Sequence, residues 1–328
     1  MKVSIIIPTL NEEKMLAGLL DSIRSQDFDD YEIIIADANS KDKTREIALN
    51  YGCRVVDGGL PAAGRNKGAA AASGDFLFFL DADVILPPGF IRNAHDEMQD
   101  RYIDLATCEI KPLSDYRLDM VVHRMINLAV ILNLWLDPKA CGCCIFVTKR
   151  LFLRAGGFDE TIYVAEDNDF VKRASSFRTL RYLNSAYIMV SIRRFQKEGR
   201  FAYMKKGIKL NIYRAFKGEI RSDEVVKYEF DAFDKIGNEL DPNFLDRIER
   251  QLLKIEDKSR NFNDRAKNSK FRNKKIDTRQ LRPQINEYAH LVKELDSYLN
   301  RRERTKQRRK KFLGFFRLGK SADKQSDE

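Results

Sequence analysis

The chain has 328 residues and a formal net charge of +10, a length that fits one large domain with an appendage or two modest domains. Hydrophobic residues make up 43% of it, which allows a sizeable core and excludes wholesale disorder. No apolar run approaches the ~18 residues of a membrane-spanning helix. Five cysteines in a chain of this length do not indicate a disulfide framework. We therefore expect a soluble protein of the cytoplasm.

The first 190 or so residues alternate short apolar runs with helix-like stretches. Strands are predicted at 3–7, 31–36, 54–56 and 76–80. Helices are predicted after Asn11 as a capping residue, from Ser40 to about Tyr51, and over 64–72. Apolar strands that alternate with helices are typical of a mostly parallel sheet covered on both faces. Such sheets bind ligands at the carboxyl ends of their strands.

Beyond residue 200 the chain is highly charged and has little strand character. Apolar residues at helical spacing predict one helix through Phe244 and Ile255 and another through Tyr288 and Leu299. Residues 256–282 are nearly all polar, which favours a loop or a poorly packed linker. The predicted domains are an α/β domain at 1–220, a helical appendage with a polar linker at 221–300, and a basic, flexible tail at 301–328.

Two carboxylates, Asp81 and Asp83, directly follow the apolar strand at 76–80. At this spacing they lie close together and repel each other, so a site that tolerates them holds a cation. Hard oxygen ligands favour Mg²⁺ or Mn²⁺, shared with substrate phosphates. The alternative for this pair is a turn.

Two further acidic clusters have ordinary structural interpretations when each is taken alone. The cluster from Asp37 to Asp42 is a good turn and helix-cap sequence. Glu166 and Asp167 fit the first turn of a helix, where acids complement the helix dipole. Their order along the chain gives them a second interpretation.

Six motifs follow one another over about 165 residues: PTLNEE at 8–13, DANSKD at 37–42, RNKG at 65–68, FLDADV at 79–84, GGFDE at 156–160 and ED at 166–167. As a set they resemble the family 2 glycosyltransferases, inverting enzymes of the GT-A fold. The resemblance covers roughly residues 1–200 and does not extend to 220–328. It implies a GT-A, Rossmann-like mostly parallel sheet flanked by helices, with the C-terminal helical part as an extension.

The resemblance implies a role for each matching residue on the donor side. The residues implied to bind the nucleotide sugar are Pro8, Thr9, Asn11, Glu12, Asp37, Arg65, Asp81 and Ala82. Asp37 matches the acid that contacts the base. Ala38 stands where the family's common DDxSxD motif has a second carboxylate, which removes one polar contact.

The resemblance also implies the metal and acceptor sides. Asp83 matches the direct ligand of Mg²⁺ or Mn²⁺, with Asp81 beside it and nearer the ribose. Asp167 matches the catalytic base, and Glu166 lies next to it on the acceptor side. The chain lacks the QxxRW motif, which argues against a processive polysaccharide synthase.

These residue types suit transfer of a sugar from a UDP- or GDP-sugar to a saccharide or a lipid-linked acceptor. A divalent ion neutralises the departing diphosphate, and one carboxylate takes the proton of the attacking hydroxyl. The rival enzyme is a nucleotidyltransferase, which would have a glycine-rich basic loop where this chain has PTLNEE. The rival outside enzymology is an inactive scaffold whose basic tail binds lipid or nucleic acid.

The tail concentrates the charge of the chain. Residues 301–328 carry a balance of +7, and Phe and Leu side chains follow the densest charge within 301–320. Basic residues beside bunched aromatics favour a peripheral anchor on an anionic membrane, at the inner face of the cytoplasmic membrane, over nucleic-acid binding. A free, solvated tail is the alternative.

Three other segments have open interpretations. The cysteines of the CGCC motif at 141–144 are expected to be reduced thiols in a strand or loop, because no matching ligands support zinc. The apolar stretch 120–136 is either a partly buried helix or a surface that touches lipid. Arg193 and Arg194 either reach the diphosphate or form a solvated pair.

Overall fold

The computed structural model describes residues 1–198, 219, 221, 241–268 and 278–298. The chain divides into two compact units, Met1–Thr278 and Arg279–Glu328. The predicted boundaries near 220 and 300, and the whole basic tail at 301–328, lie outside the described residues. In the second unit, residues 282–298 are helical, in agreement with the apolar spacing through Tyr288.

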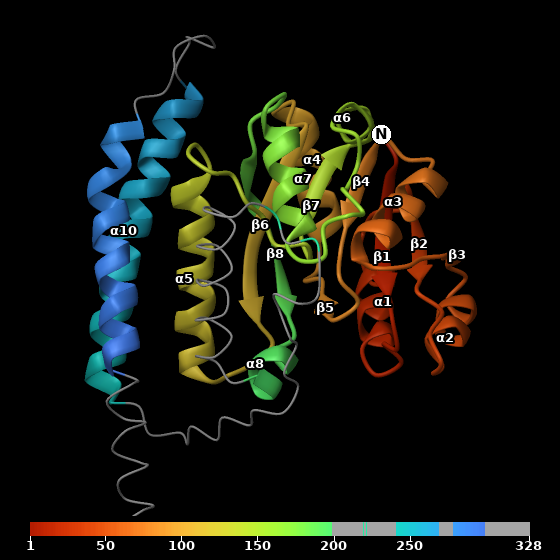
Figure 1. The fold of residues 1–328 in the computed structure, drawn as a ribbon, viewed down its shortest axis with the longest axis horizontal. Helices are drawn as coiled ribbons and strands as arrows, with labels where there is room; N and C mark the ends of the chain where they lie inside the picture. Colours follow the sequence, from red (N-terminus) through yellow and green to blue (C-terminus); the bar gives the residue numbers. More distant parts are fainter. Residues whose placement is uncertain (199–218, 220, 222–240, 269–277, 299–328) are drawn as a thin grey trace, which may run out of the picture. The chain divides into compact units, whose positions relative to one another are not determined.

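The first unit is built on one sheet with the strand order β3-β2-β1-β4-β7-β6-β8-β5 (Figure 1). The strands are β1 (Val3–Thr9), β2 (Tyr31–Asp37), β3 (Arg54–Asp57), β4 (Phe76–Phe79), β5 (Val84–Ile85), β6 (Leu105–Pro112), β7 (Ile145–Thr148) and β8 (Arg181–Val190). Pairing is parallel among β3, β2, β1 and β4 and between β6 and β8. It is antiparallel at β4–β7, β6–β7 and β5–β8, so the sheet is mixed.

Helices cover both faces of this sheet (Figure 1). The helices of the first unit are α1 (Leu16–Arg24), α2 (Thr44–Asn50), α3 (Pro61–Ala71), α4 (Phe90–Asp100), α5 (Arg117–Asn133), α6 (Lys149–Arg154), α7 (Glu166–Ser175), α8 (Arg193–Glu198) and α10 (Pro242–Asn268). Apolar residues of α1, α2 and α4 share one core cluster, and those of α3, α6 and α7 share the other.

The central strands supply both clusters because each contains a run of consecutive apolar residues. In β1, Ile5 and Ile7 join the cluster under α1 and α4, whereas Ile6 joins the cluster under α3 and α7. In β4, Phe78 and Phe79 divide between the two clusters in the same way. Alternate side chains of a strand point to opposite faces, so a strand buried on both faces needs a continuous apolar run.

The helices after β1 and β2 begin later than the sequence predicts. Asn11 does not cap α1, which starts at Leu16 with Met15 at the cap position. Ser40 does not open α2, which starts at Thr44. The polar side chains of Asn11 and Ser40 instead bond the facing loop, and Asn11 has a left-handed φ of 55° that a helix cannot contain.

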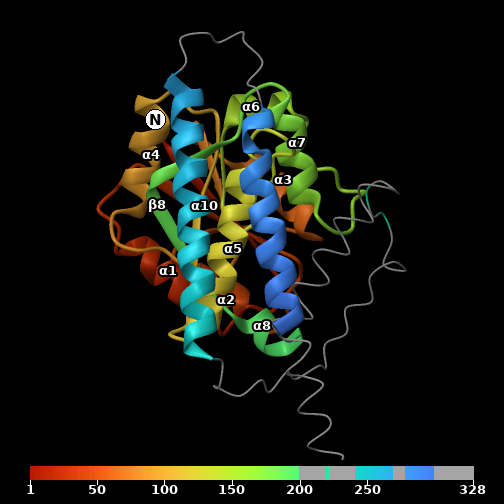
Figure 2. The ribbon, with the colours of Figure 1, turned by 90° about the vertical axis from the view of Figure 1, so that its left-hand side faces the viewer.

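The apolar helix α5 lies between β6 and α10 (Figures 1 and 2). Its Leu128 is fully buried, which confirms the partly buried helix predicted over this stretch. α10 continues to Asn268, so the polar residues 256–268 are helical where the sequence favoured a loop. Arg117 pairs with Glu249 across the two helices at 2.7 Å. No helix in the described part of the chain is long and apolar enough to cross a bilayer.

Candidate functional site

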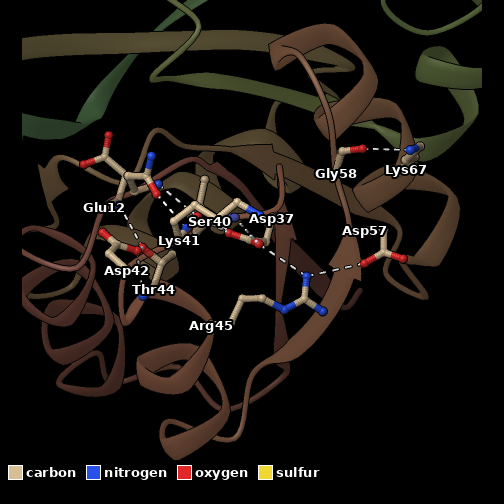
Figure 3. A network of polar contacts seen from close by, with 12 residues as sticks. Glu12, Asp37, Ser40, Lys41, Asp42, Thr44, Arg45, Asp57, Gly58 and Lys67 are labelled. Carbon is tan, nitrogen blue, oxygen red and sulfur yellow. Dashed lines mark hydrogen bonds and ion pairs between the residues drawn. The ribbon is translucent and has the colours of Figure 1, made fainter.

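The loops after β1 and β2 are joined to each other by hydrogen bonds (Figure 3). The Asn11 N–H donates to Ser40 Oγ at 2.9 Å, and the Lys41 N–H donates to Asn11 Oδ1 at 2.8 Å. One residue further on, the Glu12 N–H donates to Thr44 Oγ1 at 2.8 Å. These bonds satisfy backbone donors of both loops and hold the two strand ends as one rim.

Asp37 is the central acceptor of this rim, and 1% of its surface is exposed. Its carboxylate accepts from Thr9 Oγ1 at 3.1 Å, Ser40 Oγ at 2.5 Å and Arg45 Nη1 at 3.3 Å. Burial raises the pKa of Asp37, but the hydrogen bonds from Ser40, Thr9 and Arg45 outweigh it and leave the pKa below its usual value. Arg45 bridges onward to Asp57 at the end of β3 (Figure 3).

Asp81 and Asp83 follow the end of β4, with Ala82 buried between them. Asp83 Oδ2 lies 3.3 Å from Arg193 Nη2. The same guanidinium donates hydrogen bonds to both carboxylate oxygens of Glu12, at 2.8 Å each. Burial and the neighbouring charge of Asp81 raise the pKa of Asp83, against the lowering effect of Arg193. Arg193 therefore connects the ends of β1, β4 and β8.

A second arginine connects the Asp81–Asp83 motif to α7. Arg65 of α3 donates to Asp81 Oδ1 at 2.9 Å and to Glu166 Oε1 at 2.6 Å. It is 3% exposed, and its guanidinium lies 5.5 Å from the ring centre of Phe158. Among the described residues its Nε is a buried donor without a hydrogen-bond partner. A buried arginine with two carboxylates fixes the spacing between them.

The motif at 156–160 is fixed by the residue that follows Arg65. Asn66 Nδ2 donates to the Phe158 carbonyl, and the Phe158 N–H donates to Asn66 Oδ1, both at 2.9 Å. Gly157 has a left-handed φ of 67°, and a Cβ there would lie 2.8 Å from Asn66 Oδ1. Glycine is required at this turn for both reasons. The turn leads the chain towards α7.

Asp167 lies in the first turn of α7, after Ala165 in the left-handed region at φ 66°. Its Oδ2 accepts from the Gly142 N–H at 2.8 Å, and its Oδ1 accepts from the Asn168 N–H at 2.7 Å. Burial and the charge of Glu166 raise the pKa of Asp167 to about 6, although Arg65 and the two N–H groups lower it. A carboxylate with this pKa is ionised at neutral pH and basic enough to accept a proton.

Gly142 is packed directly against the charged groups of the site. A Cβ at this position would lie 2.5 Å from Arg65 Nη2 and 3.2 Å from Asp167 Oδ2. Only glycine lets this backbone approach both side chains. The loop before β7 is therefore part of the site.

The donor set at Asp81 and Asp83 fits a divalent ion that is shared with phosphates. Both side chains offer hard carboxylate oxygens, and the pKa of Asp83 is raised first by burial and then by the neighbouring charge of Asp81. In the part of the chain that the structure describes, no group of three or more His, Cys, Asp or Glu side chains is placed to hold a metal ion. Mg²⁺ commonly takes one or two protein carboxylates and completes its shell with water and phosphate.

The structure brings the predicted site residues together in two linked groups. Thr9, Asn11 and Asp37 form the rim at β1 and β2. Asp81, Glu166 and Asp167 cluster with Arg65, and Glu12 joins Asp83 through Arg193. Pro8 lies against α3, where a Cβ on Gly64 would be 3.2 Å from it.

Sequence reasoning missed Gly142 and Arg45. Gly142 stands inside a cysteine motif that has no feature typical of a catalytic loop. Arg45 lies on a short helix whose charge pattern is ordinary. Arg193 was noted as a residue that could reach a diphosphate, and its bonds to Glu12 were not foreseen.

The comparison with protein families matches residues 4–147 to the model described as glycosyl transferase family 2. This range contains four of the six motifs and confirms the family resemblance that they carry. The match ends with β7, before the loop at 156–160 and α7.

Two of the similar curated proteins illustrate the match. The chain is 26% identical over 241 residues to the GalNAc(5)-diNAcBac-PP-undecaprenol beta-1,3-glucosyltransferase of Campylobacter jejuni, a match that covers 70% of this chain and 75% of that protein. It is 29% identical over 207 residues to the poly(ribitol-phosphate) beta-N-acetylglucosaminyltransferase TarS of Staphylococcus aureus, covering 58% of this chain. That match spans only 34% of TarS.

Among solved structures, residues 1–349 of S. aureus TarS in complex with UDP-GlcNAc superpose with a TM-score of 0.50. The identity is 19%, and the match covers 89% of this chain and 82% of that one. The fold of the chain is that of the GT-A glycosyltransferases, with a mixed sheet flanked by helices and a C-terminal helical part.

Proposed function

Residues 4–147 belong to glycosyl transferase family 2, and from this premise we propose that the protein transfers a sugar from a nucleotide-sugar donor to an acceptor hydroxyl, with inversion and with the assistance of a divalent metal. One observation carries the proposal. Arg65 holds Asp81, which follows β4, and Glu166, which precedes Asp167, in a single buried ion-pair cluster. The cluster supports the proposal because the motif that we assign to donor binding lies beside a carboxylate with a raised pKa.

The donor binds at the strand ends in this proposal. The nucleotide-sugar side consists of Pro8, Thr9, Asn11, Glu12, Asp37, Arg65, Asp81 and Ala82. Because both oxygens of Asp37 already accept hydrogen bonds, its part is to order the rim that receives the base. The Nε of Arg65 is a buried donor without a hydrogen-bond partner among the described residues, which supports a place for Arg65 in a polar binding site.

Asp83, with Asp81, would hold Mg²⁺ or Mn²⁺ at the diphosphate. When bound, the ion supplies positive charge that stabilises the departing nucleoside diphosphate. Arg193 pairs with both Glu12 and Asp83, and its single positive charge does not balance the two carboxylates. The remaining negative charge supports a site that would hold a divalent cation beside the diphosphate.

Asp167 is the proposed catalytic base. An acceptor hydroxyl is a poor nucleophile until a positioned base accepts its proton. Glu166 forms an ion pair with Arg65 at 2.6 Å, so its carboxylate is already engaged within the protein. Asp167 accepts hydrogen bonds from two N–H groups and has a pKa of about 6, so it is basic enough to accept the proton of the hydroxyl. Inversion follows from one in-line displacement by the activated hydroxyl.

The names of the relatives suggest candidate substrates. The TarS structure contains UDP-GlcNAc, and the name of the Campylobacter relative includes a PP-undecaprenol acceptor. We infer a UDP- or GDP-sugar as donor and a saccharide or lipid-linked acceptor, used at the inner face of the cytoplasmic membrane.

The test is a panel of nucleotide sugars, each added with and without Mn²⁺, with thermal unfolding as the measurement. A ligand at ~100 Kd should stabilise the protein by roughly 2.7 kcal/mol. One nucleotide sugar should shift the unfolding midpoint, and its diphosphate should appear on incubation with an acceptor. A protein that releases pyrophosphate from a nucleoside triphosphate and ignores nucleotide sugars would be a nucleotidyltransferase, which contradicts the proposal.

A further inference from the structure

Two cysteine thiols lie within reach of each other beside the proposed catalytic base. Cys141 is exposed and Cys143 is buried. The Cys143 thiol donates a hydrogen bond to Cys141 Sγ, and the two sulfur atoms are 2.9 Å apart. A disulfide needs a sulfur–sulfur distance of roughly 2.05 Å, so the pair must close by less than an ångström.

The residue between these thiols holds Asp167. The Gly142 N–H donates to Asp167 Oδ2 at 2.8 Å. A bond between Cys141 and Cys143 closes a small ring that contains the whole backbone of Gly142. A Cβ added at Gly142 would lie 2.5 Å from Arg65 Nη2, so this backbone already packs tightly against the site. We therefore expect the backbone change that closes the ring to move the Gly142 amide away from Asp167.

We propose that Cys141 and Cys143 are a site of reversible oxidation by hydroperoxides, and that their disulfide withdraws the Gly142 N–H from Asp167 and stops sugar transfer. Formation of the disulfide is independent of the proposed function. Its effect on transfer rests on the proposed role of Asp167.

The chemistry takes two balanced steps. The exposed Cys141 sulfur attacks the O–O bond of hydrogen peroxide, becomes a sulfenic acid and releases one water. The Cys143 thiol then attacks this sulfur, the sulfur–sulfur bond forms, and the sulfenic oxygen leaves as a second water. The two thiols lose two electrons and two protons, which together reduce one hydrogen peroxide to two water molecules. A dithiol reductant reverses the reaction by thiol–disulfide exchange.

The experiment treats the full-length protein with hydrogen peroxide and measures intact mass, the position of the modified peptide, and amide hydrogen exchange. We expect the loss of two hydrogen atoms within the peptide that contains 141–144, faster exchange at Gly142, and reversal of both by dithiothreitol. Transfer should fall roughly 10- to 100-fold, the scale for loss of one hydrogen bond to a charged group, and should recover with the same reductant.

Three variants sharpen the result. Cys143→Ser keeps the exposed thiol without its partner, so Cys141 should gain oxygen and form no internal disulfide. In Cys141→Ser, treatment with peroxide should leave the mass of the peptide that contains 141–144 unchanged. The variant should also keep its transfer activity in peroxide. Cys53→Ser changes a buried thiol at the start of β3 and should behave as the parent protein.

Two outcomes overturn the proposal. In the first, Cys141 is alkylated readily in the parent protein while peroxide produces no internal disulfide, which removes the oxidation site. Alternatively the disulfide forms but exchange at Gly142 stays slow, which removes the coupling to Asp167. If the reduced protein shows no transfer with any donor, the proposed function fails, and mass and exchange still decide the thiol site.

Discussion

Replacement of Asp167 by Asn separates the chemistry of the proposed base from its contribution to stability. The amide is nearly isosteric with the carboxylate but does not accept the proton of an attacking hydroxyl. We expect kcat to fall by ~10²–10⁴, the usual range for loss of a general base. The affinity for the donor should change little, because the Asp81–Asp83 motif and the rim at Asp37 are left intact.

The pKa of Asp167 predicts the pH dependence of the parent protein. With a pKa of about 6, the carboxylate is about nine-tenths ionised at pH 7 and about one-tenth ionised at pH 5. The rate of transfer should therefore fall with an acidic limb centred near pH 6, measured with saturating donor and metal at each pH.

The same shift predicts that the Asn variant unfolds less readily. The pKa of Asp167 is higher in the folded protein than its ordinary value of 3.8. Its protonation therefore stabilises the fold fully below about pH 4, and this contribution is lost as the pH rises through about 6. A shift of about two units corresponds to about 3 kcal/mol at neutral pH. An amide cannot accept both N–H bonds of Asp167, so we expect a net gain of about 1–2 kcal/mol.

Urea unfolding at pH 7.5 and pH 4 measures this difference, with Asp169→Asn as the matched control. Asp169 lies on the same helix and pairs with Arg173 at 2.7 Å, so its loss should cost a few tenths of a kcal/mol. Turnover of the control should be near normal. The reasoning is refuted if Asp167→Asn keeps a near-normal kcat, or if it loses stability at pH 7.5 and gains none relative to pH 4.

Three further changes test other parts of the account. Excess EDTA or Asp83→Asn should abolish transfer, and Mn²⁺ should restore it only in the parent protein; full activity in chelator contradicts the metal role. Arg65→Lys removes the guanidinium group that pairs with both Asp81 and Glu166. The free energy of unfolding should therefore drop by about 2–3 kcal/mol, and kcat should fall. An unchanged urea midpoint argues against the ion-pair cluster. A protein truncated after residue 300 should lose salt-sensitive sedimentation with anionic liposomes, since each basic residue near such a surface adds about 1 kcal/mol; equal binding by both forms would rule out the tail as anchor.

Much of the fold could be predicted because its signals are local. The apolar runs of β1, β2 and β4 are continuous because both faces are buried, and the acids that follow them stand at strand ends. Helix starts were harder to predict. Asn11 and Ser40 are good capping residues, but each bonds the facing loop across about 30 residues of sequence.

The ion pairs within the site could not be predicted from local sequence patterns, because they join residues far apart in the sequence. Arg193 reaches Glu12 across 181 residues, and Arg65 reaches Glu166 across 101. The polar stretch 256–268 is helical because it continues α10, whose apolar positions face α5. Long-range packing decides such features, and polarity alone favoured a loop there.

The most direct test of the central claim is proton NMR of the reaction of the purified protein with the nucleotide sugar that stabilises it, Mn²⁺ and an acceptor. A single displacement assisted by Asp167 predicts release of the nucleoside diphosphate together with a new glycosidic bond whose anomeric configuration is opposite to that of the donor. This signal should be absent with Asp167→Asn and present with Asp169→Asn. A product that retains the configuration of the donor, or equal transfer by both variants, would contradict the account.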